Sequence, residues 1–197
     1  MLTFATAIFF LLVTPGPGVL SLAGVGSAFG WRPGWAYGIG LFFGSNAVML
    51  VAAAGLAAAL LAMPGLRVAF VVLSTGYLLY LAARIALAGS RIGFLEASAP
   101  PGVGGGLVLQ AFNPKAYAVG TFVFSNFPFA MSYGWEVVWK MGILNAVWIP
   151  IHIAWLAAGV GLRSLDLAPG TQRAINVAMA VAMVIVVTLA LRSSLSG

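Results

Sequence analysis

Long apolar stretches separated by short polar segments dominate this chain. No charged residue precedes Arg32, and none lies between Arg32 and Arg67. A helix needs about 20 consecutive apolar residues to cross the hydrocarbon core of a bilayer. Six stretches of suitable length fit the pattern, at about residues 3–23, 35–61, 67–87, 107–131, 137–162 and 173–191. The pattern therefore predicts an all-α, polytopic membrane protein of about six transmembrane helices.

The longest polar connection lies at residues 89–105, and it contains two prolines and the beginning of a glycine triplet. Clustered prolines and glycines are typical of loops. We expect this segment to be a linker inside one transmembrane domain that spans residues 1–197. The linker would separate two repeats, at about residues 1–88 and 106–197.

A duplication is indicated by Pro15 and Pro114, which lie 99 residues apart, about half the length of the chain. Three predicted spans separate the two prolines, so the two repeats would face opposite ways across the membrane. We therefore expect two inverted three-helix repeats whose first helices, the first and fourth of the chain, are broken. The alternative is that two prolines fall at this spacing by chance.

The first predicted span contains the motif Thr14-Pro15-Gly16-Pro17-Gly18. It cannot form a smooth helix, because the two prolines remove amide donors and clash with the preceding turn. In lipid, freed backbone groups are costly unless the break lines a cavity enclosed by protein. Such breaks offer amide dipoles to a carboxylate and bare carbonyls to a cation. We predict that the first four residues of the motif bind substrate; a bend with packing value only is the alternative.

The fourth predicted span contains the triplet Asn113-Pro114-Lys115. A charge at membrane depth is expensive and usually faces the interior of a helix bundle. Lys115 is expected to hold a substrate carboxylate, and Asn113 to share that task or to receive bonds from the broken backbone. The alternative is a lysine that snorkels to the membrane interface.

Polar side chains in the second and third spans are predicted to line the cavity or to couple transport. Ser45 and Asn46 follow each other in an apolar setting, and they could instead bond neighbouring helices. Tyr77, Tyr80 and Arg84 follow spacings of three and four residues and so share one helix face. An interfacial aromatic and a positive-inside anchor are the alternative for this face.

Four glycines of the second span, Gly34, Gly38, Gly40 and Gly44, favour close helix packing. For the single histidine, His152, a packing or hydrogen-bonding role is preferred over that of a proton carrier. Aromatic residues gather at predicted span ends, as in interfacial belts; they are Trp31, Trp35, Tyr37, Tyr133, Trp135 and Trp139.

Composition agrees with a lipid environment, because 62% of residues are hydrophobic and 6% are charged. Soluble domains carry roughly a quarter charged residues. In a six-span topology, five arginines would lie on one side and three basic residues on the other, namely Arg67, Lys140 and Arg192. Basic residues favour the cytoplasm, so both termini are expected outside. The net charge of +6 is scattered rather than arranged in a stripe, so no nucleic-acid partner is expected.

Several classes of chemistry are not expected. The chain has no cysteine, one histidine and three acids, which speaks against a metal centre or a redox cofactor. Ser45 has no visible acid or cysteine partner, so an intramembrane enzyme is not favoured. No acid lies within a predicted span, which leaves Lys115 without an expected protein partner and the chain without a carboxylate proton relay.

The order of the motifs resembles the LysE/RhtB family of amino-acid exporters. Members of that family are similar to this chain in having six spans. Their first span carries Thr-Pro-Gly-Pro, their third a glycine followed by a tyrosine- and leucine-rich segment, and their fourth Asn-Pro-Lys. In this chain the motifs stand at residues 14–17, 76–81 and 113–115. The resemblance implies proton-driven export of an amino acid or similar zwitterion across a bacterial inner membrane. The resemblance is also compatible with a homo-oligomer.

The chain departs from this family at three places. Gly18 stands where the family usually has asparagine, and Ser45 stands where it commonly has an acid. The fourth span ends with Ser125-Asn126-Phe127 instead of Pro-Gln-Phe.

A passive small-solute channel and a non-transporting membrane scaffold are the alternative functions.

Overall fold

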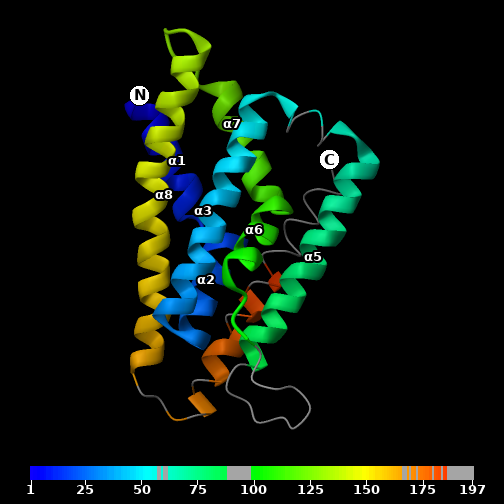
Figure 1. The fold of residues 1–197 in the computed structure, drawn as a ribbon, viewed down its shortest axis with the longest axis vertical. Helices are drawn as coiled ribbons and strands as arrows, with labels where there is room; N and C mark the ends of the chain where they lie inside the picture. Colours follow the sequence, from blue (N-terminus) through cyan, green and yellow to red (C-terminus); the bar gives the residue numbers. More distant parts are fainter. Residues whose placement is uncertain are drawn as a thin grey trace.

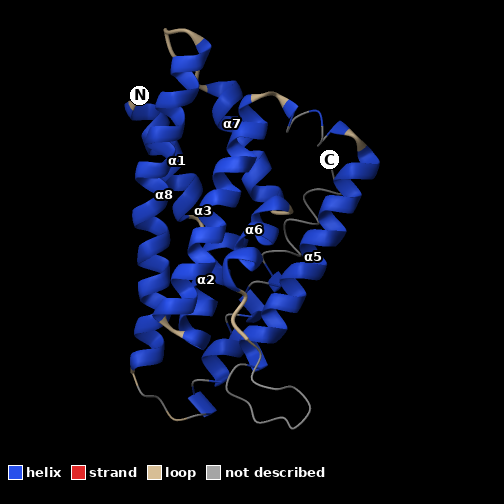
Figure 2. Cartoon of the chain, in the orientation of Figure 1, coloured by secondary structure: helices blue, strands red, loops and turns tan. Residues whose placement is uncertain are grey.

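The computed structural model describes residues 1–56, 59, 62–87, 99–165, 168, 170–171, 173–178, 180–182 and 184–185. All regular secondary structure within these ranges is helical, which confirms the all-α class (Figure 2). The main helices, labelled in Figure 1, are α1 (Leu2–Val13), α2 (Pro17–Phe29), α3 (Trp31–Ala53), α5 (Pro64–Leu87), α6 (Gly102–Ala111), α7 (Pro114–Asn126) and α8 (Tyr133–Ser164).

Two of these helices, α3 and α8, are long and apolar enough to cross a membrane, with mean hydropathies of 1.6 and 1.7. Helices α1 and α2 qualify together as a third candidate span, bent by 51° at their break. The described residues thus contain two or three candidate spans, as in a membrane protein. The count of about six stays a prediction, and its last span, at residues 173–191, lies partly outside the described residues.

Both proline motifs interrupt a helix. The first gap lies between Val13 and Pro17, and the second between Ala111 and Pro114. Each following helix begins with proline at its first position, where the missing N–H is not needed and the fixed φ suits a helix. The side chain of Asn113 caps α7 by accepting a hydrogen bond from the amide of Lys115 at 3.1 Å. Helix α2 has glycine at the capping position and no side-chain cap.

The predicted linker is wrong for its last four residues, because α6 begins at Gly102. Gly106, the last glycine of the triplet, is in close contact with α3. A Cβ built on Gly106 would lie 2.6 Å from the backbone nitrogen of Leu41, and one on Gly40 would lie 2.9 Å from the carbonyl carbon of Val103. Two helices can approach this closely only where neither has a side chain.

Helix α5 begins at Pro64. Proline is compatible with the first turn of a helix, so it marks a helix start here. Close packing by the second-span glycines is borne out where Gly34 faces Leu156 and Gly44 faces Gln110. Gly38 makes only an ordinary contact, 3.5 Å from the Leu22 side chain.

Helices α3 and α8 each pack against two helices that flank a break, and in each case those two helices come from the other half of the sequence. Helix α3 packs against α6 and α7, whereas α8 packs against α1 and α2 (Figure 1). Arg163, at the end of α8, donates to the carbonyl of Ala28, near the end of α2, at 2.6 Å. At the opposite end of α8, the hydroxyl of Tyr133 donates to the carbonyl of Ala53, the last residue of α3. This arrangement places both helix breaks between α3 and α8.

Candidate functional site

A cavity of about 50 Å³ lies where the two helix breaks meet. Helices or breaks from both halves of the chain contribute to its wall. Its polar lining residues are Thr14, Ser45, Gln110, Asn113, Lys115 and His152. The volume suffices for a few water molecules, since one water needs roughly 10–15 Å³ by this type of measure. The cavity therefore surrounds a polar centre inside an apolar helix bundle.

Lys115 joins the two breaks directly. Its Nζ donates a hydrogen bond of 2.6 Å to the carbonyl oxygen of Thr14, which ends α1. The lysine stem crosses Gly16 so closely that a Cβ there would lie 2.8 Å from Lys115 Cδ. The expectation that Lys115 lacks a protein partner is therefore wrong, because the partner is a backbone carbonyl and not an acid. The break itself supplies that carbonyl, since helix termini leave carbonyl groups without an intrahelical donor.

A chain of side-chain hydrogen bonds runs from α7 to α3 through Gln110. Asn113 Nδ2 donates to Gln110 Oε1 at 2.6 Å, and Gln110 Nε2 donates to the hydroxyl of Ser45. All three side chains are buried. Sequence reasoning missed Gln110 as a site residue. Its signal was an amide side chain in an otherwise apolar helix, one turn before Asn113.

His152 stands in the cavity wall with one ring nitrogen already engaged. Its Nδ1 lies 2.9 Å from the carbonyl oxygen of Trp148, and its ring stacks on Trp148 with centroids 3.5 Å apart. A carbonyl only accepts, so Nδ1 carries the proton and Nε2 is left as an acceptor. A Cβ on Gly18 would lie 3.8 Å from Nε2, which places that atom beside the first residues of α2. The packing role expected for His152 is present, and the ring also faces the cavity.

Other predicted site residues lie away from this cavity. Asn46 exchanges hydrogen bonds with Asn145 of α8, at 3.1 and 2.8 Å. Tyr77 donates to the carbonyl of Gly105 at 2.7 Å, and its ring lies against that of Tyr80. The three prolines of the motifs shape the breaks without lining the cavity; they are Pro15, Pro17 and Pro114. The backbone of Arg84 belongs to α5, and its side chain lies outside the described residues.

Tyr37 differs in exposure from the other aromatics expected at span ends. The other five aromatics of the predicted belts are at least 40% exposed. Tyr37 is fully buried, and its hydroxyl donates to the hydroxyl of Ser21 at 3.0 Å. Tyr37 lies three positions before Gly40, which contacts α6, so close packing there encloses the ring.

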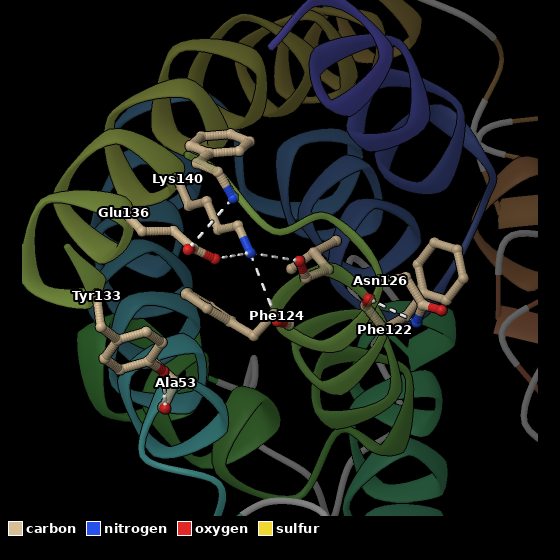
Figure 3. Close-up of polar contacts among 9 residues, drawn as sticks. Ala53, Phe122, Phe124, Asn126, Tyr133, Glu136 and Lys140 are labelled. Atoms are coloured by element: carbon tan, nitrogen blue, oxygen red, sulfur yellow. Dashed lines mark hydrogen bonds and ion pairs between the residues drawn. The ribbon is translucent and has the colours of Figure 1, made fainter. Parts of the chain in front are cut away.

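A second polar centre lies near the start of α8 (Figure 3). Lys140 Nζ is 2.7 Å from Glu136 Oε1, and it also donates to the carbonyl of Val123 at 3.0 Å. The rings of Phe4, Phe124 and Phe129 surround the ammonium at 5.1–5.9 Å. The lysine is fully buried, although the sequence analysis counted it as a base in an outer connection.

This centre corrects a second expectation, namely that no acid lies in a span. Helix α8 begins at Tyr133, earlier than predicted, so Glu136 belongs to its first turn. Its other oxygen, Oε2, accepts from the backbone amide of Phe129 at 3.3 Å. The ion pair therefore fastens α7 and the connection after it to α8, and neither of its residues lines the cavity.

Within the described ranges, no group of three His, Cys, Asp or Glu side chains comes together. The cavity offers an ammonium, neutral amides, a hydroxyl and an imidazole, which together suit the binding of a small polar solute. Comparison of the chain with protein-family models, with curated proteins and with solved structures found no match.

Proposed function

We propose that this protein is a secondary transporter that exports a small carboxylate-bearing metabolite, such as an amino acid, across a bacterial inner membrane. The observation that carries the proposal is the ammonium of Lys115 at a cavity between two broken helices. A positive charge at membrane depth usually belongs to a substrate or ion pathway. Broken helices that meet between long apolar helices are typical of transporter binding sites.

A substrate carboxylate would compete with the carbonyl of Thr14 for Lys115. An ionised acceptor bonds an ammonium roughly twice as strongly as a neutral one does. Binding would therefore release the tie between the two breaks and allow the broken helices to move apart. Such movement would widen the cavity, whose volume of about 50 Å³ holds only a few water molecules.

The helix bounds support the inverted repeat that this mechanism uses. Adding 99 to α1 (2–13) gives 101–112, and α6 spans 102–111. Adding 99 to α2 (17–29) gives 116–128, and α7 spans 114–126. Adding 99 to α3 (31–53) gives 130–152, within three residues of the start of α8 at 133. Two inverted repeats of three spans would explain this register, and the chain would then cross the bilayer six times.

The resemblance to LysE/RhtB exporters points to the same function, from the motifs at both breaks. The hydrogen bond from Lys115 to Thr14, which ties the two breaks together, favours alternating access over a permanently open pore. The proposal includes no proton relay through a carboxylate in the cavity. Within the described residues, Glu136 is the acid nearest in sequence to His152, and it is paired with Lys140.

Reconstitution tests this function. Purified protein in liposomes would be loaded with single amino acids and related carboxylates, and efflux would be followed under an imposed pH gradient. We expect at least one solute to move uphill and to stop when an uncoupler is added. Downhill movement that ignores the uncoupler would identify a passive channel, and no protein-dependent movement of any solute would leave only a scaffold.

A further inference from the structure

The cavity has a single formal charge among its lining residues, and that charge is positive. Lys115 provides it, whereas the remaining polar lining consists of hydroxyl, amide and imidazole groups. Glu136 lies eight residues before Leu144, the first residue of α8 that lines the cavity, roughly 12 Å along the helix axis. Its carboxylate is bound to Lys140. It therefore cannot balance a second positive charge placed in the cavity.

The backbone amides at the start of α2 supply hydrogen-bond donors at the cavity. Helix α2 has no side-chain cap, and its second and third residues, Gly18 and Val19, line the cavity with amides that have no partner inside the helix. These amides and the dipole of α2 favour an anion next to Lys115. By contrast, the amides of Gln110 and Asn113 are occupied with each other, with Ser45 and with the cap of α7.

Among the side chains of the cavity wall, His152 supplies an acceptor opposite these donors. His152 is 5% exposed, and its Nδ1 is held by the carbonyl of Trp148, so Nε2 presents a lone pair to the cavity. A neutral hydroxyl on the substrate could donate to this nitrogen. Such a pattern, with an anion site beside one acceptor, matches a carboxylate that bears a hydroxyl on the adjacent carbon.

We propose that the cavity selects a small 2-hydroxy monocarboxylate over the amino acid of the same shape. This inference rests on the proposed transport function and narrows its substrate class. An anion neutralises Lys115 and leaves no net charge. A zwitterion brings an ammonium as well, and that ammonium would be buried without an acidic partner among the described cavity residues, which is strongly unfavourable in a low-dielectric site.

Matched pairs of probes isolate this one difference. Lactate and alanine, and likewise glycolate and glycine, differ only by a hydroxyl in place of the ammonium. Binding is measured as the ligand-induced rise in unfolding temperature of detergent-solubilised protein. Transport is measured separately by counterflow into proteoliposomes. We expect lactate and glycolate to bind at least about tenfold more tightly than alanine and glycine, and Lys115→Met to abolish the preference.

Ser45→Asp provides a reversal test, because it places an acid on the cavity wall opposite Lys115. We expect this variant to prefer alanine over lactate. Ser45→Asn has the same size without the charge, and we expect it to keep the direction of the wild-type preference. If Ser45→Asp does not fold, the wild-type comparison between the paired probes still decides the question.

The outcomes separate the two proposals. Tighter binding of alanine or glycine to the wild type overturns the selectivity for hydroxy acids and leaves transport standing. Equal binding within each pair overturns it too. Selective binding of lactate or glycolate without counterflow of any probe supports the anion site and contradicts the transport function. If neither the hydroxy acids nor the amino acids bind, the proposed anion site is wrong.

Discussion

The side-chain amides of Asn46 and Asn145 hydrogen-bond to each other in both directions, with Nδ2-to-Oδ1 distances of 3.1 and 2.8 Å. The two residues are 99 positions apart, the same offset that separates Pro15 from Pro114. Equivalent residues of two repeats can contact each other in this reciprocal way only near the axis that relates the repeats. The pair therefore marks where such an axis would pass, between α3 and α8.

Removal of this amide pair is the first prediction. Asn46→Ala or Asn145→Ala leaves the remaining amide without its partner inside the bundle, and we expect each to destabilise the protein by about 1 kcal/mol. The double variant should lose less than the sum of the two, because no amide is then left unpaired. Unfolding of detergent-solubilised protein by denaturant measures the three free energies. Strict additivity would show that the two side chains do not interact.

The glycine face between α3 and α6 gives the second prediction. A Cβ on Gly106 would lie 2.6 Å from the backbone nitrogen of Leu41, whereas one on Gly104 would meet nothing within 4 Å. Gly106→Ala should therefore force α6 away from α3 and lower stability by about 1–3 kcal/mol, as overpacking does. Gly104→Ala is the matched control on the same helix. It should be neutral or slightly stabilising, because alanine favours a helix. Equal unfolding temperatures for both variants would contradict this packing.

The helix breaks could be predicted from the sequence because proline acts locally. Pro17 and Pro114 each remove an amide donor, and each begins a helix in the structure. The site residues beside them were predictable for the same reason. The glycine triplet was misread because glycine has two opposite uses, in flexible linkers and in tight helix contacts. Only the presence of Gly40 opposite Gly106 distinguishes the two, and that pairing is a tertiary fact.

The other misreadings concern partners that are distant in sequence. Lys140 reads as an interfacial base until Glu136 and the rings around it are placed together. Gln110 becomes a site residue only through its contacts with Ser45 and Asn113. Lys115 bonds to a backbone carbonyl, and a search of the sequence for an acidic side chain could not find that partner.

The buried ion pair provides the third prediction. Glu136→Gln would leave the ammonium of Lys140 with two backbone carbonyls and no counter-charge. Loss of one partner of a buried pair costs about 3–5 kcal/mol. The double variant Glu136→Gln, Lys140→Met should recover part of this loss, since no buried charge remains. The measurement is the free energy of unfolding in detergent. A single variant as stable as the wild type would show that the pair contributes nothing.

Membrane orientation is the fourth prediction. Lys140 no longer counts as a loop base, so five basic residues stand against two in the six-span topology. Both termini are therefore expected outside and the linker inside. A reporter fused at Gly197 should read as external, and one inserted near Ser98 as cytoplasmic. A cytoplasmic Gly197 would contradict the orientation, and opposite locations of the two termini would exclude an even number of spans.

The last prediction separates binding from folding at Lys115. Its replacement by methionine removes a hydrogen bond from a charged group, worth about 1.5–3 kcal/mol, to the carbonyl of Thr14. The same change removes a charge that costs about 2.5–3.5 kcal/mol at membrane depth. The two effects nearly cancel, so Lys115→Met should insert and accumulate about as well as the wild type. Export should nevertheless be abolished, because the ammonium that receives the substrate carboxylate is missing.

Lys115→Arg refines the test, since it keeps the charge. The lysine stem passes so close to Gly16 that the planar guanidinium has little room, and its fixed fork does not replace a compact ammonium. We expect export by this variant to fall at least about tenfold, with normal insertion. The quantity to measure is efflux per molecule of inserted protein. Wild-type export by Lys115→Met would mean that the lysine only anchors the helix, and the binding site would then have to lie elsewhere.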